Sequence, residues 1–332
     1  MQAQQAVRHC GRRAAGQPAS VAPRTPTLRR RRAACECVAA APRSSGAPRR
    51  VRCAAASTDT AVVDERRVFS GVPLPPVGAK ATQLVEVKPG LLWALRQDFP
   101  EAGPASIWLN CSVAKLSSGG LLVYSPVAPT PEMLDALRSL PGAVEHIVAP
   151  SMSPEHWLYV NATAAAFPDA TVWVCPGLTE VNLPGIGDAK ISAGPRVRTI
   201  GPDMTAALGG EVDFALFVGP LGLFKEAVLY ARNARAIFSG DLFFGAFEDE
   251  GMPTALQRRI GGVVGIYKRI GCPVAFLQML LKRDEGREWA AKVAGWDFDT
   301  ATGGHLSAGI NKDRYGVDGR EAFMESFKFM LQ

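Results

Sequence analysis

The chain has 332 residues, of which 20% are charged, and a formal net charge of +6. The charge is unevenly placed, because residues 1–57 hold twelve arginines, no lysine and one acid, Glu36, whereas residues 58–332 carry a net charge of −5. A mildly acidic body repels phosphate backbones, so this composition excludes nucleic acid as the expected partner. No apolar run is long enough to span a membrane.

Residues 1–53 are predicted to be a transit peptide. The segment is rich in Arg, Ala, Ser and Pro, nearly free of acids, and lacks the continuous apolar run of a secretory signal. Residues 51–57 resemble a chloroplast cleavage region, so we expect a mature start near Ala54 and a location in the stroma rather than the lumen. The import machinery is then an expected partner through the leader. The alternative is a disordered basic tail.

The cysteines fit a reducing compartment. Four of the seven lie in the leader, and the body keeps Cys111, Cys175 and Cys272. This odd and dispersed set argues against a disulfide scaffold.

An approach linker is expected at residues 54–82, where the stretch 71–78 is too rich in proline for a helix. One domain is expected from residue 83 to residue 332. Its first half is predicted to open with strands at 84–87, 91–96, 106–116 and 121–125. Thr130 then predicts a helix cap, with Pro131 at the first helical position and an apolar stripe at Met133, Leu134, Leu137 and Leu140. A buried strand at 144–149, a helix from Ser153–Pro154 to about Phe167 and a strand at 171–175 complete this half.

The second half repeats this style. Strands are predicted at 212–218, 226–230, 235–239 and 296–299, and helices at 253–269, 273–283, 286–295 and 319–331. The order of β-rich, αβ, β-rich and α segments predicts an α+β fold. We expect an α/β/β/α sandwich, two facing mixed sheets with helices outside, and a doubly wound sheet is the alternative. No Gly-x-Gly-x-x-Gly follows a strand and no P-loop is present, so no nucleotide cofactor is expected.

Glu155 and His156 are the first residues that could carry chemistry. They follow the buried strand 144–149, and side chains at the C-terminal end of a strand face the crevice where α/β proteins bind ligands. His156 is expected in the first turn of a helix, where the macrodipole disfavours the imidazolium form. The neutral imidazole is the form that binds metal.

Asp241 and His305 are expected at two further strand ends. Asp241 follows an apolar strand and the break at Ser239–Gly240, and a carboxylate there is costly unless it is hydrogen-bonded, exposed in a cleft or bound to a cation. His305 follows Gly303–Gly304, and these glycines would let the backbone approach a site closely.

These three places resemble the metallo-β-lactamase superfamily, over about residues 84–310. The motif His-x-His-x-Asp-His of that superfamily reads here as Ser151-x-Ser153-x-Glu155-His156, and the pairs Gly240–Asp241 and Gly304–His305 match its later motifs. The resemblance implies that the three histidines of the first metal are gone, since no histidine occurs near Leu221–Leu223. It implies that the set of the second metal is retained as Glu155, His156 and His305, with Asp241 as the carboxylate that bridges both ions.

The chain also resembles a plant and cyanobacterial branch of unknown function that shares the depleted motif. The similarity lies at Ile147–Pro150, Glu155–His156, Phe167–Ala170, Val172–Val174, Trp296–Phe298 and Gly304–His305. The branch has no assigned reaction.

Two hypotheses of function remain open, and with them whether the chain is an enzyme. Two imidazoles and two carboxylates suit one zinc, iron or manganese ion with a position left for water, and such an ion would lower the pKa of that water. The first hypothesis is a mononuclear hydrolase of an ester, thioester or amide, with Asp241 as metal ligand or proton acceptor. The second is a non-catalytic pseudoenzyme whose cleft binds a small molecule or a protein.

Each candidate also has a structural interpretation. His156 could simply pack in a helix, Glu155 could complement the helix dipole, and Asp241 could accept backbone N–H bonds. Other conspicuous residues are predicted to be structural: His146, the thiol of Cys175, and the tryptophans Trp157, Trp173 and Trp296.

Overall fold

The computed structural model describes residues 68–69, 72–73, 81–99, 107–182, 189–219, 222, 224–247, 254–263, 265–271, 284–305 and 307–332. The chain divides into two units, Met1–Asp59 and Thr60–Gln332, and every described residue belongs to the second. The predicted transit peptide, most of the predicted linker and the predicted helix 273–283 lie outside the described residues.

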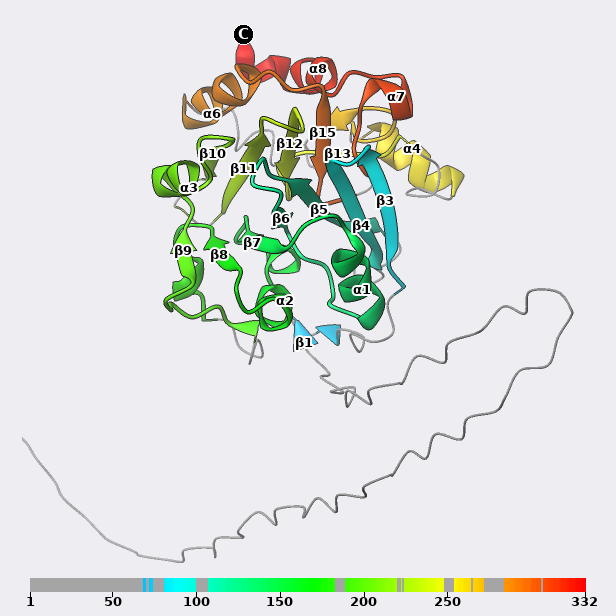
Figure 1. Cartoon of the computed structure of the whole chain (residues 1–332). Helices are drawn as coiled ribbons and strands as arrows, with labels where there is room; N and C mark the ends of the chain where they lie inside the picture. Colours follow the sequence, from blue (N-terminus) through cyan, green and yellow to red (C-terminus); the bar gives the residue numbers. More distant parts are fainter. Residues whose placement is uncertain are drawn as a thin grey trace, which may run out of the picture. The chain divides into compact units, whose positions relative to one another are not determined.

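A seven-stranded sheet is formed by the first half of the domain (Figure 1). Its spatial order follows the chain, with antiparallel pairing up to β6 and parallel pairing from β6 to β9. The strands are β3 (Gln83–Lys88), β4 (Leu92–Phe99), β5 (Ile107–Lys115), β6 (Leu121–Tyr124), β7 (Val144–Ala149), β8 (Thr171–Val174) and β9 (Val197–Thr199).

A four-stranded sheet, in the order β10-β11-β12-β15, is formed by the second half. Its strands are β10 (Val212–Val218), β11 (Lys225–Ala231), β12 (Ala236–Ser239) and β15 (Thr300–Gly303). The first three are antiparallel neighbours, and β12 pairs with β15 in parallel. Two separate mixed sheets confirm the predicted sandwich and contradict the doubly wound alternative.

Helices cover the outer face of each sheet (Figure 1). One apolar cluster joins α1 (Pro131–Ser139) and α2 (Val160–Ala166) to the seven-stranded sheet, and another joins α6 (Asp284–Ala294) and α8 (Gly319–Leu331) to the four-stranded sheet. A third cluster contains residues of both sheets, among them Leu122, Trp173, Leu229 and Phe238, and fills the space between them. The shorter elements are β1 (Val68–Phe69), β2 (Val72–Pro73), η3 (Pro154–His156), η4 (Leu178–Glu180), α3 (Pro202–Ala207), β13 (Phe244–Gly245), α4 (Ala255–Val263), β14 (Ile270–Gly271) and α7 (Lys312–Tyr315).

The predicted cap of α1 is confirmed. The hydroxyl of Thr130 accepts a hydrogen bond from the backbone N–H of Met133 at 3.1 Å, and Pro131 is the first helical residue. Met133 and Leu137, two members of the predicted stripe, are fully buried in the core beneath the helix.

The helix predicted from Ser153 to Phe167 is broken, which corrects the prediction for the segment that carries Glu155 and His156. A single 3₁₀ turn, η3, ends at His156, and α2 begins only at Val160. Trp157, Leu158 and Tyr159 are all buried. Three consecutive buried side chains do not fit one face of a helix, so the chain leaves the helical path between the two turns.

Two predictions in the last third of the chain are also wrong. The helix predicted at 253–269 ends at Val263, because Gly265 and Lys268 adopt positive φ angles and Ile270–Gly271 pairs with β13 instead. No strand forms at the predicted residues 296–299, and the strand in this part of the chain is β15, which begins at Thr300. The residues before Thr300 turn toward Arg235, whose side chain pairs with Asp297 and Asp299.

The C-terminal ends of four strands position the candidate site. In the larger sheet, Ser125 follows β6 and η3 follows β7. In the smaller sheet, Asp241 follows β12 and His305 follows its parallel neighbour β15. The two sheets are joined here, since the backbone N–H of Asn110 on β5 donates to the carbonyl oxygen of Gly304 at 2.7 Å.

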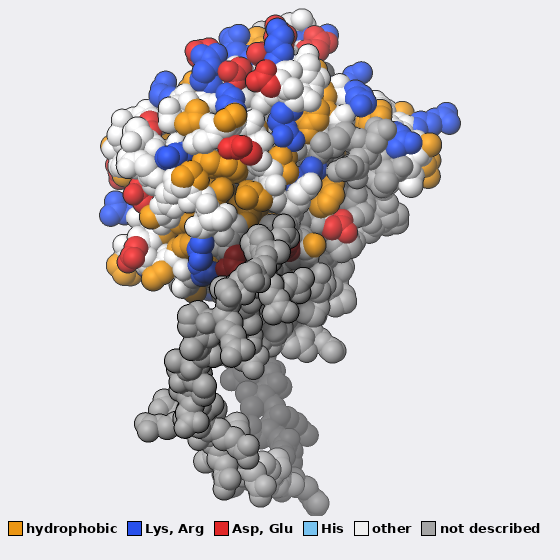
Figure 2. Space-filling view, turned by 45° about the vertical axis from the view of Figure 1, so that its right-hand side comes forward, with side chains coloured by type: hydrophobic (Ala, Val, Ile, Leu, Met, Phe, Trp, Pro, Cys, Tyr) orange, Lys and Arg blue, Asp and Glu red, His pale blue; other side chains and the backbone are white. Residues whose placement is uncertain are grey.

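The described surface is mixed in charge on the face shown in Figure 2, where lysines and arginines lie among aspartates and glutamates. In the part of the chain that the structure describes, no helix has the length and apolar composition needed to cross a bilayer.

Candidate metal centre

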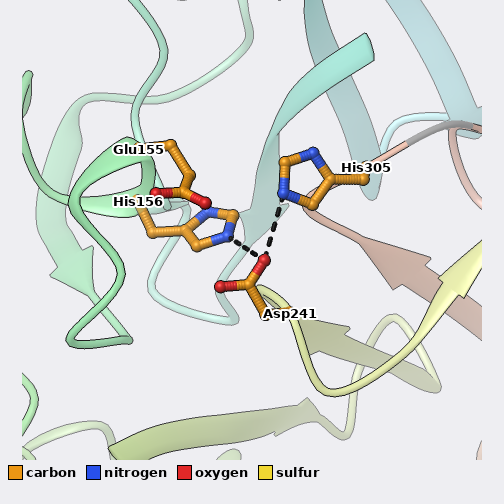
Figure 3. A group of neighbouring side chains, drawn as sticks. All are labelled: Glu155, His156, Asp241 and His305. Carbon is orange, nitrogen blue, oxygen red and sulfur yellow. Dashed lines mark hydrogen bonds and ion pairs between the residues drawn. The ribbon is translucent and has the colours of Figure 1, made fainter. Parts of the chain in front are cut away.

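The structure brings together all four residues that the sequence singled out. One side-chain donor atom from each of Glu155, His156, Asp241 and His305 lies within 4.8 Å of the others (Figure 3). The rings of His156 and His305 have their centroids 5.2 Å apart, in an edge-to-face arrangement. The segments that carry them are far apart in the chain, so it is the sandwich that creates this cluster.

His156 is held at both ring nitrogens. Its Nε2 lies 3.2 Å from Oδ1 of Asp241, and its Nδ1 lies 2.8 Å from the hydroxyl of Ser125. Ser125 is fully buried and has a φ of 54°, a conformation that is costly for a residue other than glycine. Sequence reasoning missed Ser125, which was predicted only as the end of a strand.

His305 is held in the same way. Its Nε2 lies 3.1 Å from Oδ1 of Asp241, and its Nδ1 lies 3.3 Å from the backbone carbonyl oxygen of Trp108. A carbonyl oxygen only accepts, so Nδ1 carries the proton in that contact. A neutral ring with this tautomer points the lone pair of Nε2 at a carboxylate oxygen. That arrangement is repulsive unless a proton or a metal ion lies between the two atoms.

The donor set fits one metal ion. Donor atoms of a four-coordinate ion with bonds of about 2.0–2.2 Å lie roughly 3.3–3.6 Å apart. The contacts of Asp241 at 3.1 and 3.2 Å are close to this spacing, and the whole set lies within 4.8 Å. Outer partners that fix each ring, here Ser125 and the Trp108 carbonyl, are typical of metal-binding histidines. The four residues could therefore hold an ion, and that they bind one stays a prediction.

Two glycines let the backbone approach His156, and the sequence predicted such an approach for Gly304 but not for Gly240. A Cβ atom on Gly304 would lie 2.4 Å from Cε1 of His156, and one on Gly240 would lie 2.9 Å from its Cδ2. The backbone N–H of Gly304 donates to the carbonyl oxygen of Gly240 at 3.3 Å. Gly240 and Gly304, the glycines that precede Asp241 and His305, therefore both pack against the imidazole of His156.

Gly304→Ala is expected to destabilise the protein by about 1–3 kcal/mol, the usual cost of overpacking a core, and to weaken metal binding. Besides the His156 ring, the added methyl group would meet the Gly240 carbonyl oxygen at 3.0 Å. The matched control is Gly194→Ala, where a Cβ would meet nothing within 4 Å. Urea unfolding of both variants checks the prediction, and equal unfolding free energies would contradict it.

The charge on His156 differs from the expectation. Burial lowers the pKa of His156, but the charge of Asp241 and the hydrogen bond to it outweigh burial and raise the pKa from 6.5 to about 9. The expectation that a helix dipole keeps this ring neutral is therefore wrong for the metal-free protein. The reason is that η3 is one short turn, whereas Asp241 lies in direct contact.

Asp241 stays ionised in this setting. Burial raises its pKa, but the charge of His156 and the hydrogen bonds from His156 and His305 lower it well below the ordinary value of 3.8. A carboxylate with so low a pKa is a good ligand and a poor proton acceptor.

Residues 89–245 match a family described as Domain of unknown function (DUF4336). No curated protein matches the chain. The chain is similar in fold to a metallo-β-lactamase from Pontibacter korlensis, at 12% identity and a TM-score of 0.49, covering 75% of this chain and 99% of that one. It is also similar to a metallo-β-lactamase from Erythrobacter litoralis, at 11% identity and a TM-score of 0.47, covering 75% of this chain and 96% of that one. A third similar structure is the Flv1 flavodiiron core from Synechocystis sp. PCC6803, at 12% identity and a TM-score of 0.47, covering 76% of this chain and 61% of that one.

Glu226 is a second residue that sequence reasoning missed. It lies on β11, is fully buried, and its carboxylate accepts hydrogen bonds from the turn that carries Asp241. The pKa of Glu226 is raised, because burial and the charge of Asp241 outweigh the lowering by the hydroxyl of Ser239 and the charge of His156. The only signal in the sequence was an acid inside an apolar strand, which is costly unless donors surround it.

The residues predicted to be structural do not belong to the group of four donors. Trp157, Trp173 and Trp296 are buried in the core, and burial raises the pKa of Cys175 to about 12, as expected of an inert thiol. Nδ1 of His146 accepts a hydrogen bond from Nε1 of Trp173 at 3.2 Å. A cavity of about 560 Å³ lies elsewhere, and its lining includes Phe247 and residues of β14 and α8.

Proposed function

We propose that the chain is a metallo-β-lactamase-like, metal-dependent hydrolase with one zinc, iron or manganese ion held by Glu155, His156, Asp241 and His305. One observation carries the proposal. The Nε2 atoms of both histidines converge on the same oxygen of Asp241, at 3.2 and 3.1 Å, while each Nδ1 is engaged by another group. Once His156 has lost its proton, this arrangement would direct two imidazole lone pairs and one carboxylate toward a common point.

Each residue around the proposed ion has its own role. A divalent ion bound there would lower the pKa of a bound water toward neutrality. Ser125 and the Trp108 carbonyl orient the two imidazoles, so these rings need little reorganisation on binding. Asp241 acts as a ligand in this proposal, because its Oδ1 lies 3.2 and 3.1 Å from the Nε2 atoms of the two histidines. The substrate class is an ester, thioester or amide.

A specific observation favours the second candidate, a non-catalytic binding protein. Where the superfamily motif has its first histidine, Ser151 is fully buried, and its hydroxyl accepts the backbone N–H of Ser153 at 3.1 Å. Ser151 therefore stabilises a turn. A residue with a structural role occupies the motif position where the superfamily has a ligand of its first metal. A chain with one ion or none could bind a small molecule or a protein without catalysis.

Metal analysis of the purified protein separates the two candidates. The protein should begin at Ala54, because the leader holds His9 and four cysteines, side chains that can bind zinc outside the proposed site. All described residues are retained in this form. We expect near-stoichiometric zinc, iron or manganese, a lower unfolding temperature with chelator, and ester, thioester or amide hydrolysis that chelator abolishes. A metal-free protein whose stability ignores chelators would contradict the metal centre. Metal without hydrolysis would favour the binding protein.

We also propose that the protein works in the chloroplast stroma, as a member of a plant and cyanobacterial branch. The motifs Glu155–His156 and Gly304–His305 and the arginine-rich leader support this. Residues 1–53 fused to a fluorescent protein should enter isolated chloroplasts and be cleaved near Ala54, as read by N-terminal mass spectrometry. A fusion in which the leader arginines are replaced by glutamine is the control. Import that is equal for both fusions, or absent for both, would contradict the proposal.

A further inference from the structure

Glu226 gathers four donors from the turn that presents Asp241. Its Oε1 accepts from the hydroxyl of Ser239 at 2.6 Å, from the backbone N–H of Gly240 at 2.8 Å and from that of Leu242 at 3.3 Å. Its Oε2 accepts from the backbone N–H of Asp241 at 2.6 Å. All four partners donate, which is the pattern of an ionised carboxylate and matches no amide side chain.

The backbone of the same strand holds the segment that leads to Glu155 and His156. Glu226 and Ser151 form an antiparallel bridge. The N–H of Ala227 donates to the carbonyl oxygen of Pro150 at 2.8 Å, and the N–H of Met152 donates to that of Lys225 at 2.9 Å. The start of β11 therefore fixes two of the three ligand-bearing segments, one through its backbone and one through the Glu226 side chain.

Glu226 and His156 both lie against the face of Gly240 on which a side chain would project. A Cβ atom on Gly240 would lie 3.0 Å from Oε2 of Glu226 and 2.9 Å from Cδ2 of His156. The carboxylate therefore lies next to Gly240, as the ring of His156 does, and both of its oxygens already accept hydrogen bonds from residues 239–242. The Glu226 carboxylate lies next to Asp241, and with both groups ionised their combined negative charge attracts a cation to the site.

We propose that Glu226 is the positioning residue of the metal centre. Its carboxylate holds the backbone of residues 240–242 in the turn that aims Asp241 between His156 and His305, and its charge strengthens the attraction for a divalent ion without ligating it. The part of this inference that concerns the ion rests on the proposed function. The part that concerns the turn holds for the metal-free protein as well.

The experiment compares three variants of the protein that begins at Ala54. Glu226→Gln keeps the shape but places an amide N–H₂ against donors, Glu226→Asp keeps the charge on a shorter stem, and the exposed Glu288→Gln is the control for charge removal. Zinc affinity is measured by competition with a chromophoric chelator. Loss of an outer partner of a metal ligand typically costs 10- to 100-fold in affinity. We expect that loss for Glu226→Gln, a smaller loss for Glu226→Asp, and none for Glu288→Gln.

Two spectroscopic readouts separate positioning from general stability. With cobalt(II), displacement of Asp241 should shift the visible d–d bands of Glu226→Gln relative to the unchanged protein and the control. Unchanged affinity and bands in Glu226→Gln would overturn the proposal. In the metal-free protein, the amide protons of Gly240 and Asp241 should resonate downfield and exchange slowly, and both properties should be lost in Glu226→Gln.

The amide-proton measurement on the metal-free protein also tests this inference separately from the proposed function. If the unchanged protein binds no metal, the proposed function and the electrostatic role of Glu226 both fail, and the amide resonances alone decide whether Glu226 holds the turn. If Glu226→Gln does not fold, Glu226→Asp and Ser239→Ala supply the comparison, because Ser239→Ala removes one donor and keeps the charge. Amide resonances unaffected in both would overturn the positioning role.

Discussion

His156→Ala is expected to abolish metal binding and to lower the free energy of unfolding by about 3–5 kcal/mol, the usual cost of breaking a buried ion pair by removing one partner. The ring is fully buried between Asp241 at 3.2 Å and Ser125 at 2.8 Å. Its loss leaves the Asp241 carboxylate with His305 alone and next to the buried charge of Glu226. The hydroxyl of Ser125 also loses the imidazole as a partner.

The matched control is His146→Ala. The side chain of His146 accepts one hydrogen bond, from Trp173, and lies outside the group of four donors. This variant should therefore lose about 1 kcal/mol and keep its metal. Elemental analysis gives the metal content, and urea unfolding with chelator present gives the stability of each metal-free variant. Equal metal content in the two variants would contradict the assignment of His156 as a ligand.

The parts of the fold that were predictable from the sequence depend on local chemistry. The cap at Thr130 needs only a hydroxyl three residues before a free N–H, and the strand ends were marked by breaks such as Ser239–Gly240. The glycine pair before His305 indicated a close backbone approach, and Gly304 does face the ring of His156. The order of these strand ends and glycines along the chain, together with the resemblance to a known superfamily, was enough to select the four donor residues.

The residues that support the site were not predictable in this way, because their roles depend on contacts across the sandwich. Ser125 reaches His156 only because β6 and β7 run in parallel and end at the same edge. Glu226 has the sequence context of an apolar strand, and its donors come from a turn that β12 brings alongside. The break after η3 follows from burial of residues 157–159 on more than one side, which helical periodicity does not show.

Raising the pH is expected to have opposite effects on the metal-free and the metal-bound protein. The folded metal-free protein binds the proton of His156 with a pKa of about 9, against 6.5 as the reference for an unfolded chain. This proton therefore stabilises the fold fully below pH 6.5, and the stabilisation is lost as the pH rises through about 9. A metal ion needs the unprotonated ring, so its apparent affinity should rise over the same window, by up to about tenfold per pH unit for one proton released.

Urea unfolding at pH 6.5, 8 and 9.5, with excess chelator or with saturating zinc, measures both effects. His156→Gln is the reference, since it removes the titrating ring while other groups that titrate in this range remain. The unchanged metal-free protein should lose stability relative to this variant as the pH rises. The gain from zinc, obtained by comparing unfolding with and without the ion, should grow. Parallel pH profiles for the two proteins would mean that Asp241 does not hold a proton on His156. In that case the contact between His156 and Asp241 either contains a cation other than a proton or does not form in solution.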